Sequence, residues 1–479
     1  MALKETLATA PEAAGPRFAW RPVAAIAALV AVGHLVSASL TSGYWLDEAY
    51  MLAIGRHHLD WGSVDQPPLV PALAWLMDTV APGSELPLRV PVILVTTAAV
   101  VVAASIAREL GGGRRAQVLT AAAQATGLFA AVFGHWLTPY AFEPLEWLVV
   151  FWLLVRWVRV RDDRLLLVLG VVLGIALMTK LQAALLAGVL LVAVAVFGPR
   201  ELLARPRLWL GGVIALLLAA PTLVWQAVHG WPQLAMSSVV AREVELVYGG
   251  RPTVAWELIA FGGLLGVGLA LAGLWFLVRD PGLRSYRFVG AGFVALYVLF
   301  VATEGRPYYL LGYLGVMAAV GAVGVERRGR TRTWPAWTAG VLAGVLAVAG
   351  LVVSPAFVSA AGDRDQVVAA AATFRAVPDT GRTALVGSSY VTAAYLDAYS
   401  DELGLAPAHS ANRGYGYLDP PSETDTDVLY VGGDPDELRP YFRSVRSLGT
   451  PDGVPAWLLT DRTRPWASFW PGLRHLDIV

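Results

Sequence analysis

The 479-residue sequence contains no cysteine, so it can form neither a disulfide bond nor a thiolate metal site. Only two of its 36 basic residues are lysines, Lys4 and Lys180. Charged residues make up 15% of the chain and sum to a net charge of zero, which gives no sign of a nucleic-acid partner. The glycines at 111–113 are not followed by the GK[ST] pattern of a phosphate-binding loop, so we find no signature of an ATP-driven pump.

Apolar residues dominate the composition. They account for 56% of the chain, more than a water-soluble protein of this length normally carries. Several runs approach the roughly 20 residues that cross a bilayer core. We therefore predict a polytopic α-helical membrane protein with about eleven spans, near residues 22–40, 88–107, 117–133, 145–158, 165–179, 182–197, 208–228, 254–278, 288–303, 308–325 and 336–353.

Basic residues alternate along the connections between these spans. Twenty lie in one set of connections, among them Lys4, Arg330 and Arg332, and the other set holds only Arg56, Arg89, Lys180, Arg242, Arg251 and Arg306. The positive-inside rule then places the N-terminus in the cytoplasm and the C-terminal region outside a plasma membrane. The least certain pair is 165–179 and 182–197, which can also be read as one broken or re-entrant helix.

Two regions between and after the spans carry their own patterns. In the longest outer loop, 41–87, Asp47 is expected to cap a short interfacial helix with Met51, Leu52, Gly55 and Leu59 on one face. Residues 354–479 are expected to form a small extracytoplasmic α/β domain, separate from the transmembrane module 1–353. Its predicted elements are helices at 365–375 and 437–445 and strands at 383–386, 427–431 and 456–459.

The first candidate site is acidic and lies in the long outer loop. Asp47 and Glu48 follow the first span, and Asp65 and Gln66 come later in the same loop. Carboxylates this close to hydrocarbon are costly unless they face a cavity, so they are candidates for function. A helix cap with interfacial solvation explains them equally well.

The second outer loop contains Glu143 and Glu146, three residues apart and able to share a helix face. A preference for acidic residues in a first helical turn is the competing explanation. Lys180 lies between two spans on the same predicted side. Its simplest alternative role is to extend its ammonium group to the membrane interface.

A third candidate cluster opens the tenth predicted span, where Arg306 is followed by Tyr308 and Tyr309. A guanidinium group can clamp a lipid phosphate in a bidentate manner while phenol groups donate hydrogen bonds. Anchoring in the aromatic belt of the membrane is the alternative for the two tyrosines.

Taken together, these segments resemble the polyprenyl-phosphate-dependent glycosyltransferases of the GT-C superfamily, specifically the bacterial relatives of protein O-mannosyltransferases and aminoarabinose transferases. The resemblance covers essentially the whole chain. It is carried by residues 45–50, 65–69, 142–147, 178–180, 223–226, 229–232, 305–310 and 465–466.

The resemblance implies a role for each candidate. Asp47, with Glu48 beside it, would be the general base, and Glu143 would stand where relatives usually have aspartate. Lys180 and Arg306, with Tyr308 or Tyr309, would bind the lipid phosphate. Leu181 departs from the family, in which tyrosine commonly follows the lysine.

The expected function is transfer of a sugar from a polyprenyl-phosphate donor to a hydroxyl group of a protein, lipid or glycan at the outer membrane face, with inversion. The phosphate leaves readily, so the demanding steps are deprotonating the acceptor and holding the anion. The residues leave the need for a divalent metal open and identify no cofactor. A transporter or lipid flippase is the main alternative, although paired repeats and midplane charges would then be expected. A non-catalytic scaffold would leave the Asp47 and Arg306 clusters without a purpose.

Overall fold

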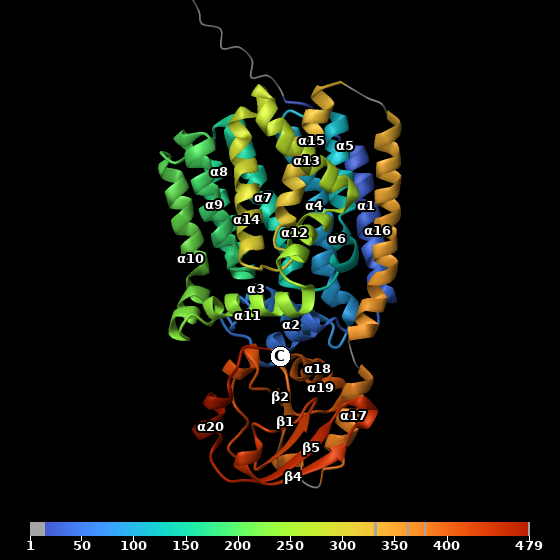
Figure 1. Cartoon of the computed structure of the whole chain (residues 1–479), viewed down its shortest axis with the longest axis vertical. Coiled ribbons are helices and arrows are strands. Elements are labelled where there is room, and N and C mark those ends of the chain that lie inside the picture. The colour runs from blue at the N-terminus through green and yellow to red at the C-terminus, as the bar shows by residue number, and fades with distance from the viewer. Residues whose placement is uncertain (1–14, 330–332, 362–363, 378–379, 478–479) are drawn as a thin grey trace, which may run out of the picture.

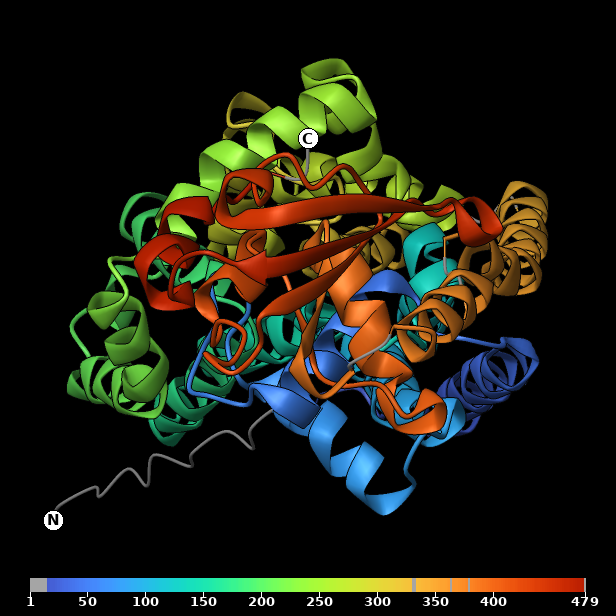
Figure 2. The same ribbon diagram turned by 90° about the horizontal axis from the view of Figure 1, so that it is seen from below.

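The computed structural model describes residues 15–329, 333–361, 364–377 and 380–477, in which a bundle of helices stands on a small sheet domain (Figure 1). The long helices of the bundle run roughly parallel to the long axis of the molecule, and the sheet domain covers one end of the bundle (Figure 2). The expected α-helical membrane fold with a C-terminal sheet domain is therefore confirmed.

The helices of the bundle follow the apolar runs of the sequence. They are α1 (Trp20–Leu40), α4 (Glu85–Glu109), α5 (Arg114–Ala125), α6 (Leu128–Phe133), α7 (Pro139–Val160), α8 (Arg164–Thr179), α9 (Gln182–Phe197), α10 (Pro206–Val228), α12 (Arg251–Ala260), α13 (Gly263–Arg279), α14 (Arg287–Ala302), α15 (Leu311–Arg327) and α16 (Thr333–Ala361). Short 3-10 turns, η1 (Arg200–Leu202) and η2 (Pro281–Tyr286), connect α9 to α10 and α13 to α14.

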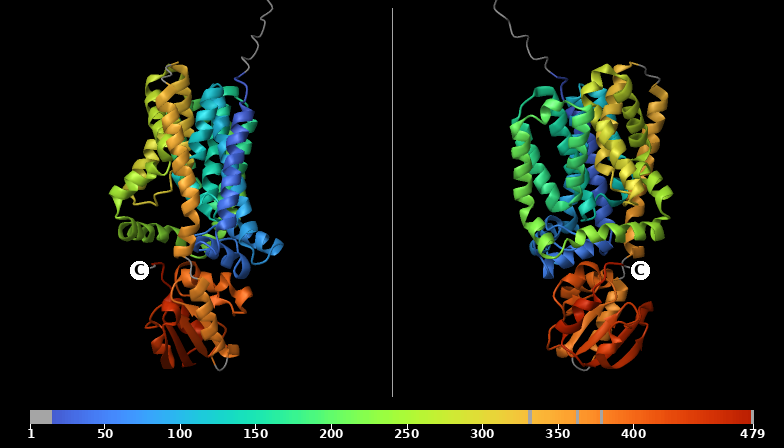
Figure 3. Two further views of the ribbon diagram at one scale, coloured as in Figure 1. Left: turned by 90° about the vertical axis from the view of Figure 1, so that its right-hand side faces the viewer. Right: turned by 60° about the vertical axis from the view of Figure 1, so that its left-hand side comes forward.

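Within the described residues, five helical segments are each long and apolar enough to cross a membrane alone, and a bent pair of helices would make six. The count of about eleven spans therefore stays a prediction. Helices α8 and α9 are separate and stand side by side in the bundle (Figure 3). The segments 165–179 and 182–197 therefore form two helices and not one broken helix.

Two predicted spans are wrong in detail because each is broken. The run 254–278 is divided into α12 and α13, which meet at an angle of 94°. Gly263 makes this bend with a φ of +70°, and a Cβ there would lie 2.4 Å from the carbonyl oxygen of Thr126. The run 117–133 is likewise divided into α5 and α6. Hydropathy records the apolar length of a segment and not a break within it.

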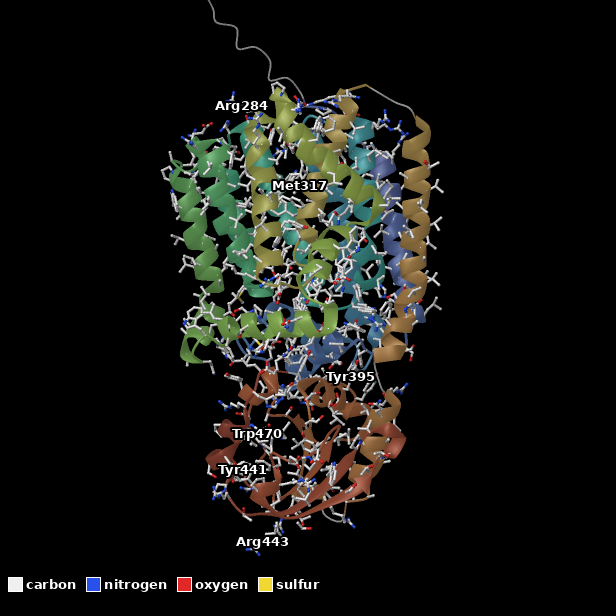
Figure 4. The ribbon with its side chains drawn as sticks, viewed as in Figure 1. Arg284, Met317, Tyr395, Tyr441, Arg443 and Trp470 are labelled. Atoms are coloured by element: carbon white, nitrogen blue, oxygen red, sulfur yellow. The ribbon has the colours of Figure 1, made fainter. Side chains whose placement is uncertain are left out.

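The basic connections meet at one end of the bundle. Glu109, at the end of α4, forms ion pairs with Arg156 and Arg159 at the end of α7. Arg284 lies at the end of the bundle remote from the sheet domain (Figure 4). Lys4, Arg330 and Arg332 lie outside the described residues. The two ends of the bundle thus differ in charge as the alternation predicts, while the orientation in a membrane stays a prediction.

Three helices lie at the opposite end, next to the sheet domain: α2 (Leu46–His57), α3 (Leu69–Val80) and α11 (Pro232–Tyr248). Helix α11 runs across the base of the bundle (Figures 1 and 3). The expected cap of α2 is wrong, because Trp45 is the N-cap residue and Asp47 lies inside the first turn. Leu59 lies beyond the end of the helix at His57. The ring of Trp45 stacks on that of Trp136, with centroids 4.5 Å apart.

The sheet domain begins after α16. Its five strands are β1 (Thr383–Gly387), β2 (Ala408–His409), β3 (Asp427–Val431), β4 (Phe442–Gly449) and β5 (Ala456–Arg462), in the order β2-β1-β3-β5-β4. Strand β1 pairs in parallel with β2 and β3, and β5 pairs antiparallel with β3 and β4. Its helices are α17 (Arg364–Arg375), α18 (Tyr390–Ala398), α19 (Ser400–Leu403) and α20 (Trp466–Leu473), with 3-10 turns η3 (Thr380–Arg382), η4 (Arg413–Tyr417), η5 (Arg439–Tyr441) and η6 (Pro451–Gly453).

The three predicted strands are confirmed, and so is the first predicted helix, as α17. The second, 437–445, is wrong: its residues form the turn η5 and the start of strand β4. Five of the eight residues of β4 are exposed at the edge of the sheet, so its apolar residues are too few to mark a strand by alternation.

The sheet domain docks on α2 through polar and aromatic contacts. Arg56 forms an ion pair with Asp78 at 2.6 Å and donates at 2.8 Å to the carbonyl oxygen of Ala398, at the end of α18. Tyr395, which lies at the junction in Figure 4, donates to the carbonyl oxygen of Tyr44. A Cβ at Gly414 would lie 1.9 Å from the Tyr50 hydroxyl oxygen, so only glycine allows this close approach. The docked domain therefore closes over the acidic outer loop.

Candidate active site

Asp47 lies in the first turn of α2, where the chain leaves the first upright helix. Its Oδ2 accepts a hydrogen bond of 3.0 Å from the hydroxyl group of Tyr140, and that hydroxyl oxygen accepts one of 3.1 Å from the indole N–H of Trp45. Tyr140 belongs to the first turn of α7, which starts with Thr138 as N-cap and Pro139 at its first position. Two outer segments therefore meet at a half-buried carboxyl group.

The protonation of Asp47 reflects opposing influences. Burial raises its pKa above that of an exposed aspartate, and the nearby charge of Asp65 acts in the same direction. The Tyr140 hydrogen bond and the positive charges of Arg306 and Arg413 oppose this rise. A carboxylate with a raised pKa is a better proton acceptor than an ordinary exposed one.

Glu48 has a different environment from its neighbour, because it is fully buried in an ion pair. Arg89, also fully buried, donates to both oxygens of Glu48 at 3.0 and 2.8 Å. The backbone N–H groups of Trp45 and Leu137 donate to the same two oxygens. Arg89 further donates to three carbonyl oxygens at the end of α1 and in the following loop. This arrangement favours a structural role for Glu48 over proton transfer.

Asp65 and Gln66 lie in the same outer loop, between α2 and α3. Asp65 accepts a hydrogen bond of 2.9 Å from the hydroxyl group of Tyr50 and one from the side chain of Gln66. Burial raises the pKa of Asp65, and the charge of Arg413 is the largest influence against that rise. Gln226 holds this loop from α10 by donating to the carbonyl oxygen of Ser63 at 2.8 Å.

Lys180 lies between α8 and α9 and turns inward. Its Nζ is 3.1 Å from Oε2 of Glu143 on α7. The same Nζ lies 4.2 Å from the ring centroid of Tyr309 and 5.3 Å from that of Tyr308. The Tyr308 ring packs against Tyr140, with centroids 4.7 Å apart. The structure thus joins Lys180, the two tyrosines, Tyr140 and Asp47 in one continuous group.

Arg306 reaches this group from the loop before α15 and pairs with a residue that sequence reasoning missed. Its Nη2 donates to Oε2 of Glu243 on α11, and Nη2 of Arg413 in the sheet domain donates to Oε1 of Glu243. Glu243 and Arg413 are both buried. Glu243 lies between Arg242 and Glu245 on α11, so the sequence did not single it out, whereas an arginine among the glycines and tyrosines of 412–417 was the signal for Arg413.

A small apolar cavity of about 50 Å³ lies beside the group, inside the bundle. Tyr140 forms part of its wall, and the other walls come from α4, α5, α6, α7, α15 and the junction of α12 and α13. Tyr140 therefore contacts both the cavity and Asp47. Among the described residues, no group of three or more histidine, aspartate or glutamate side chains is placed to hold a metal ion.

Comparison with known proteins supports a common fold. The model of the dolichyl-phosphate-mannose-protein mannosyltransferase family matches residues 65–225, a segment that contains Glu143 and Lys180 but not Asp47. A search of curated proteins finds none that matches.

Solved structures match over more of the chain. The structure of ArnT from Cupriavidus metallidurans bound to undecaprenyl phosphate has a TM-score of 0.65 at 16% identity, covering 91% of this chain and 97% of that one. The arabinofuranosyltransferase AftD from Mycobacteria gives 0.52 at 15% identity, covering 93% of this chain and 40% of that one. The oligosaccharyltransferase AglB from Archaeoglobus fulgidus, with an inhibitory peptide and a dolichol-phosphate, gives 0.50 at 13% identity, covering 80% and 64%. The resemblance is thereby confirmed: this chain is a membrane protein with the fold of the GT-C glycosyltransferases.

Proposed function

We propose that this protein transfers a sugar from a polyprenyl-phosphate donor to a hydroxyl acceptor at the outer face of the plasma membrane. The observation that carries the proposal is the half-buried carboxyl group of Asp47, which Tyr140 orients within a site that also contains Arg306, Lys180 and Tyr308. A proton acceptor and cations for an anionic lipid are what this reaction needs.

The reaction is a direct displacement. The acceptor oxygen attacks the anomeric carbon from the side opposite the phosphate, so the new C–O bond forms as the bond to the phosphate oxygen breaks. Asp47 takes the proton of the acceptor hydroxyl group. The polyprenyl phosphate leaves with the bonding electrons, and the configuration at the anomeric carbon is inverted.

The remaining residues bind and orient the substrates. Lys180 and Arg306 are the cations proposed for the lipid phosphate, with Tyr308 and Tyr309 as hydrogen-bond donors. Glu143 positions Lys180 through the 3.1 Å ion pair. Asp65 and Gln66 belong to the loop proposed to contact the acceptor or sugar. The small cavity beside Tyr140 has apolar walls next to the site. ArnT and AglB have been solved with a polyprenyl phosphate, which supports a donor of this class.

The test is transfer by purified protein from a set of polyprenyl-phosphate sugars, comparing wild type with Asp47→Asn. The substitution removes the proton acceptor with little change in volume, so turnover should fall by roughly 100-fold or more while undecaprenyl phosphate still binds. Asp60→Asn is the matched control in the same loop, since Asp60 bonds only the structural Trp225 indole and the backbone of Trp61 among the described contacts. Near-normal turnover of Asp47→Asn would remove Asp47 from the catalytic role.

A further inference from the structure

Glu243 is held between two arginines that come from different parts of the chain. Arg306, from the loop before α15, binds Oε2, and Arg413, from turn η4 of the sheet domain, binds Oε1. The side chain of Arg306 is 15% exposed and those of Arg413 and Glu243 are 6% and 5% exposed. One buried carboxylate therefore pairs with two guanidinium groups, one at each oxygen, and its single negative charge balances only one of them.

Arg413 is held in place by its surroundings. Its φ of +49° lies in the left-handed region, which is unfavourable for a residue other than glycine. Its guanidinium group lies 4.6 Å from the ring centroid of Tyr390 and donates to the Tyr390 hydroxyl oxygen at 3.3 Å. Strain of this kind persists where the surrounding contacts determine the position of a side chain.

Arg413 also retains an unused hydrogen-bond donor. Its Nε is buried and has no hydrogen-bond partner among the described residues. A buried donor without a partner is costly, and such groups often mark a site that binds a further acceptor. Both arginines lie close enough to Asp47 to oppose the rise in its pKa. The cation pair therefore lies near the candidate base.

We propose that Arg306 and Arg413 form a two-sided clamp for the phosphate group of a polyprenyl phosphate, and that Glu243 occupies this clamp as an internal competitor. The inference rests on the proposed function and extends it to a residue of the sheet domain. A phosphate monoester carries about −1.5 to −2 charges at neutral pH and three terminal oxygens, so it satisfies two guanidinium groups better than one carboxylate does.

The clamp has a specific role in the transfer. The phosphate group of the donor is a diester, and it becomes a monoester with additional negative charge when the bond to the sugar breaks. Cations fixed on two sides of that group stabilise the charge as it develops. Because Arg413 belongs to the sheet domain, this domain completes the site. Glu243 lies on α11. It leaves the clamp when its side chain moves away from the two arginines.

The alternative is that Glu243 only ties the sheet domain to α11. The two explanations predict different effects of Glu243→Gln on the affinity for undecaprenyl phosphate. Under the clamp proposal, Glu243→Gln removes the competing charge, so the protein should bind undecaprenyl phosphate more tightly. Under the tether explanation, the same substitution weakens the docked arrangement and leaves the affinity unchanged or lower.

The experiment measures binding of undecaprenyl phosphate to the full-length protein in nanodiscs, together with the melting temperature of each variant. Glu243→Gln should lower the Kd by roughly tenfold, and Arg413→Gln should raise it by roughly tenfold, the effect expected of one charge-assisted hydrogen bond. Arg413→Lys keeps the charge but loses the fork of donors, so its Kd should lie between those of wild type and Arg413→Gln.

Matched controls come from exposed ion pairs of the sheet domain. Glu402→Gln removes a carboxylate that pairs with Arg364, and Arg439→Gln removes an arginine that pairs with Asp434 and Asp436. Neither should change the Kd. If Glu243→Gln binds undecaprenyl phosphate no more tightly than wild type, the clamp proposal is overturned, whatever the Arg413 variants do.

The outcome also separates this inference from the proposed function. Wild-type protein that binds undecaprenyl phosphate and transfers sugar, but whose affinity does not respond to Glu243→Gln, retains the function and loses the clamp. Wild-type protein that binds no undecaprenyl phosphate in the presence of intact folding contradicts both.

Discussion

The hydroxyl group of Tyr140 donates a hydrogen bond of 3.0 Å to Oδ2 of Asp47, across 93 residues of sequence. Tyr140 also lines the apolar cavity and packs against Tyr308. This tyrosine thus connects the proposed base, the proposed phosphate-binding tyrosine and the space beside them. Its hydrogen bond favours the ionised form of Asp47, because it opposes the rise in pKa that burial causes.

Tyr140→Phe should shift the acid limb of the pH–rate profile to higher pH. Asp47 must be ionised to accept a proton, so turnover falls as pH falls through its pKa, which loss of the phenol raises further. We expect turnover at neutral pH to drop on the order of tenfold, the effect of one hydrogen bond to a charged group. Measurement of kcat/KM against pH in both proteins checks this. An unchanged acid limb would show that Tyr140 does not act through Asp47.

Glu48→Gln should impair folding rather than catalysis. The substitution leaves Arg89 buried without its counter-charge, and breaking a buried pair typically costs about 3–5 kcal/mol. We expect a clear fall in the melting temperature and in the yield of folded protein. Glu85→Gln, in the same outer region, is the control. If Glu48→Gln melts like wild type but transfers no sugar, Glu48 is part of the chemistry and the structural assignment is wrong.

Lys180→Met should weaken donor binding more than it slows the transfer of sugar from the bound donor. The ammonium group supplies charge near Tyr308 and Tyr309, whereas methionine preserves the apolar length of the side chain. We expect KM for the donor to rise by roughly tenfold. Lys180→Arg should restore much of the affinity, since it keeps the charge. Equal behaviour of the methionine and arginine variants would instead favour a role for Lys180 in membrane anchoring.

Asp397 should make the sheet domain more stable at low pH. It is fully buried, accepts hydrogen bonds from the N–H of Ala408 and the hydroxyl group of Tyr415, and burial raises its pKa to about 7 from 3.8. The folded form therefore retains a proton that the unfolded form loses, so this contribution to stability declines from about pH 4 to about pH 7 and is constant above.

The measurement is the melting temperature of the full-length protein as a function of pH. Asp397→Asn should flatten the decline and raise the melting temperature at pH 7 relative to wild type. Asp436→Asn, an exposed position in the same domain, should leave the curve unchanged. A pH dependence that persists in Asp397→Asn would assign it to other groups.

The sheet domain is expected outside the cell, and the Arg-rich end of the bundle in the cytoplasm. Reporter proteins fused after Arg330 and after Val479 should therefore lie on opposite sides of the membrane, because helix α16 separates them. Protease access in intact cells measures this directly. Both reporters on one side would contradict the predicted topology.

The sequence by itself determined that this is a membrane protein, because most helices of the bundle form from apolar runs and a bilayer selects for length and hydropathy. It also indicated Asp47, Lys180 and Arg306 as candidates, since a charge at the edge of hydrocarbon is costly wherever the rest of the chain lies. Strands β1, β3 and β5 were also predictable, because each forms from a short apolar run that is largely buried.

Only the tertiary structure decided which charges are free to act. Asp47 and Glu48 are adjacent in sequence, yet Glu48 is fully paired with Arg89 while Asp47 meets Tyr140. Glu243 and Arg413 lie 170 residues apart and acquire a shared role only because the sheet domain docks against α11. Burial and ion pairing depend on which distant segments pack together, and hydropathy, which is local, carries no record of that packing.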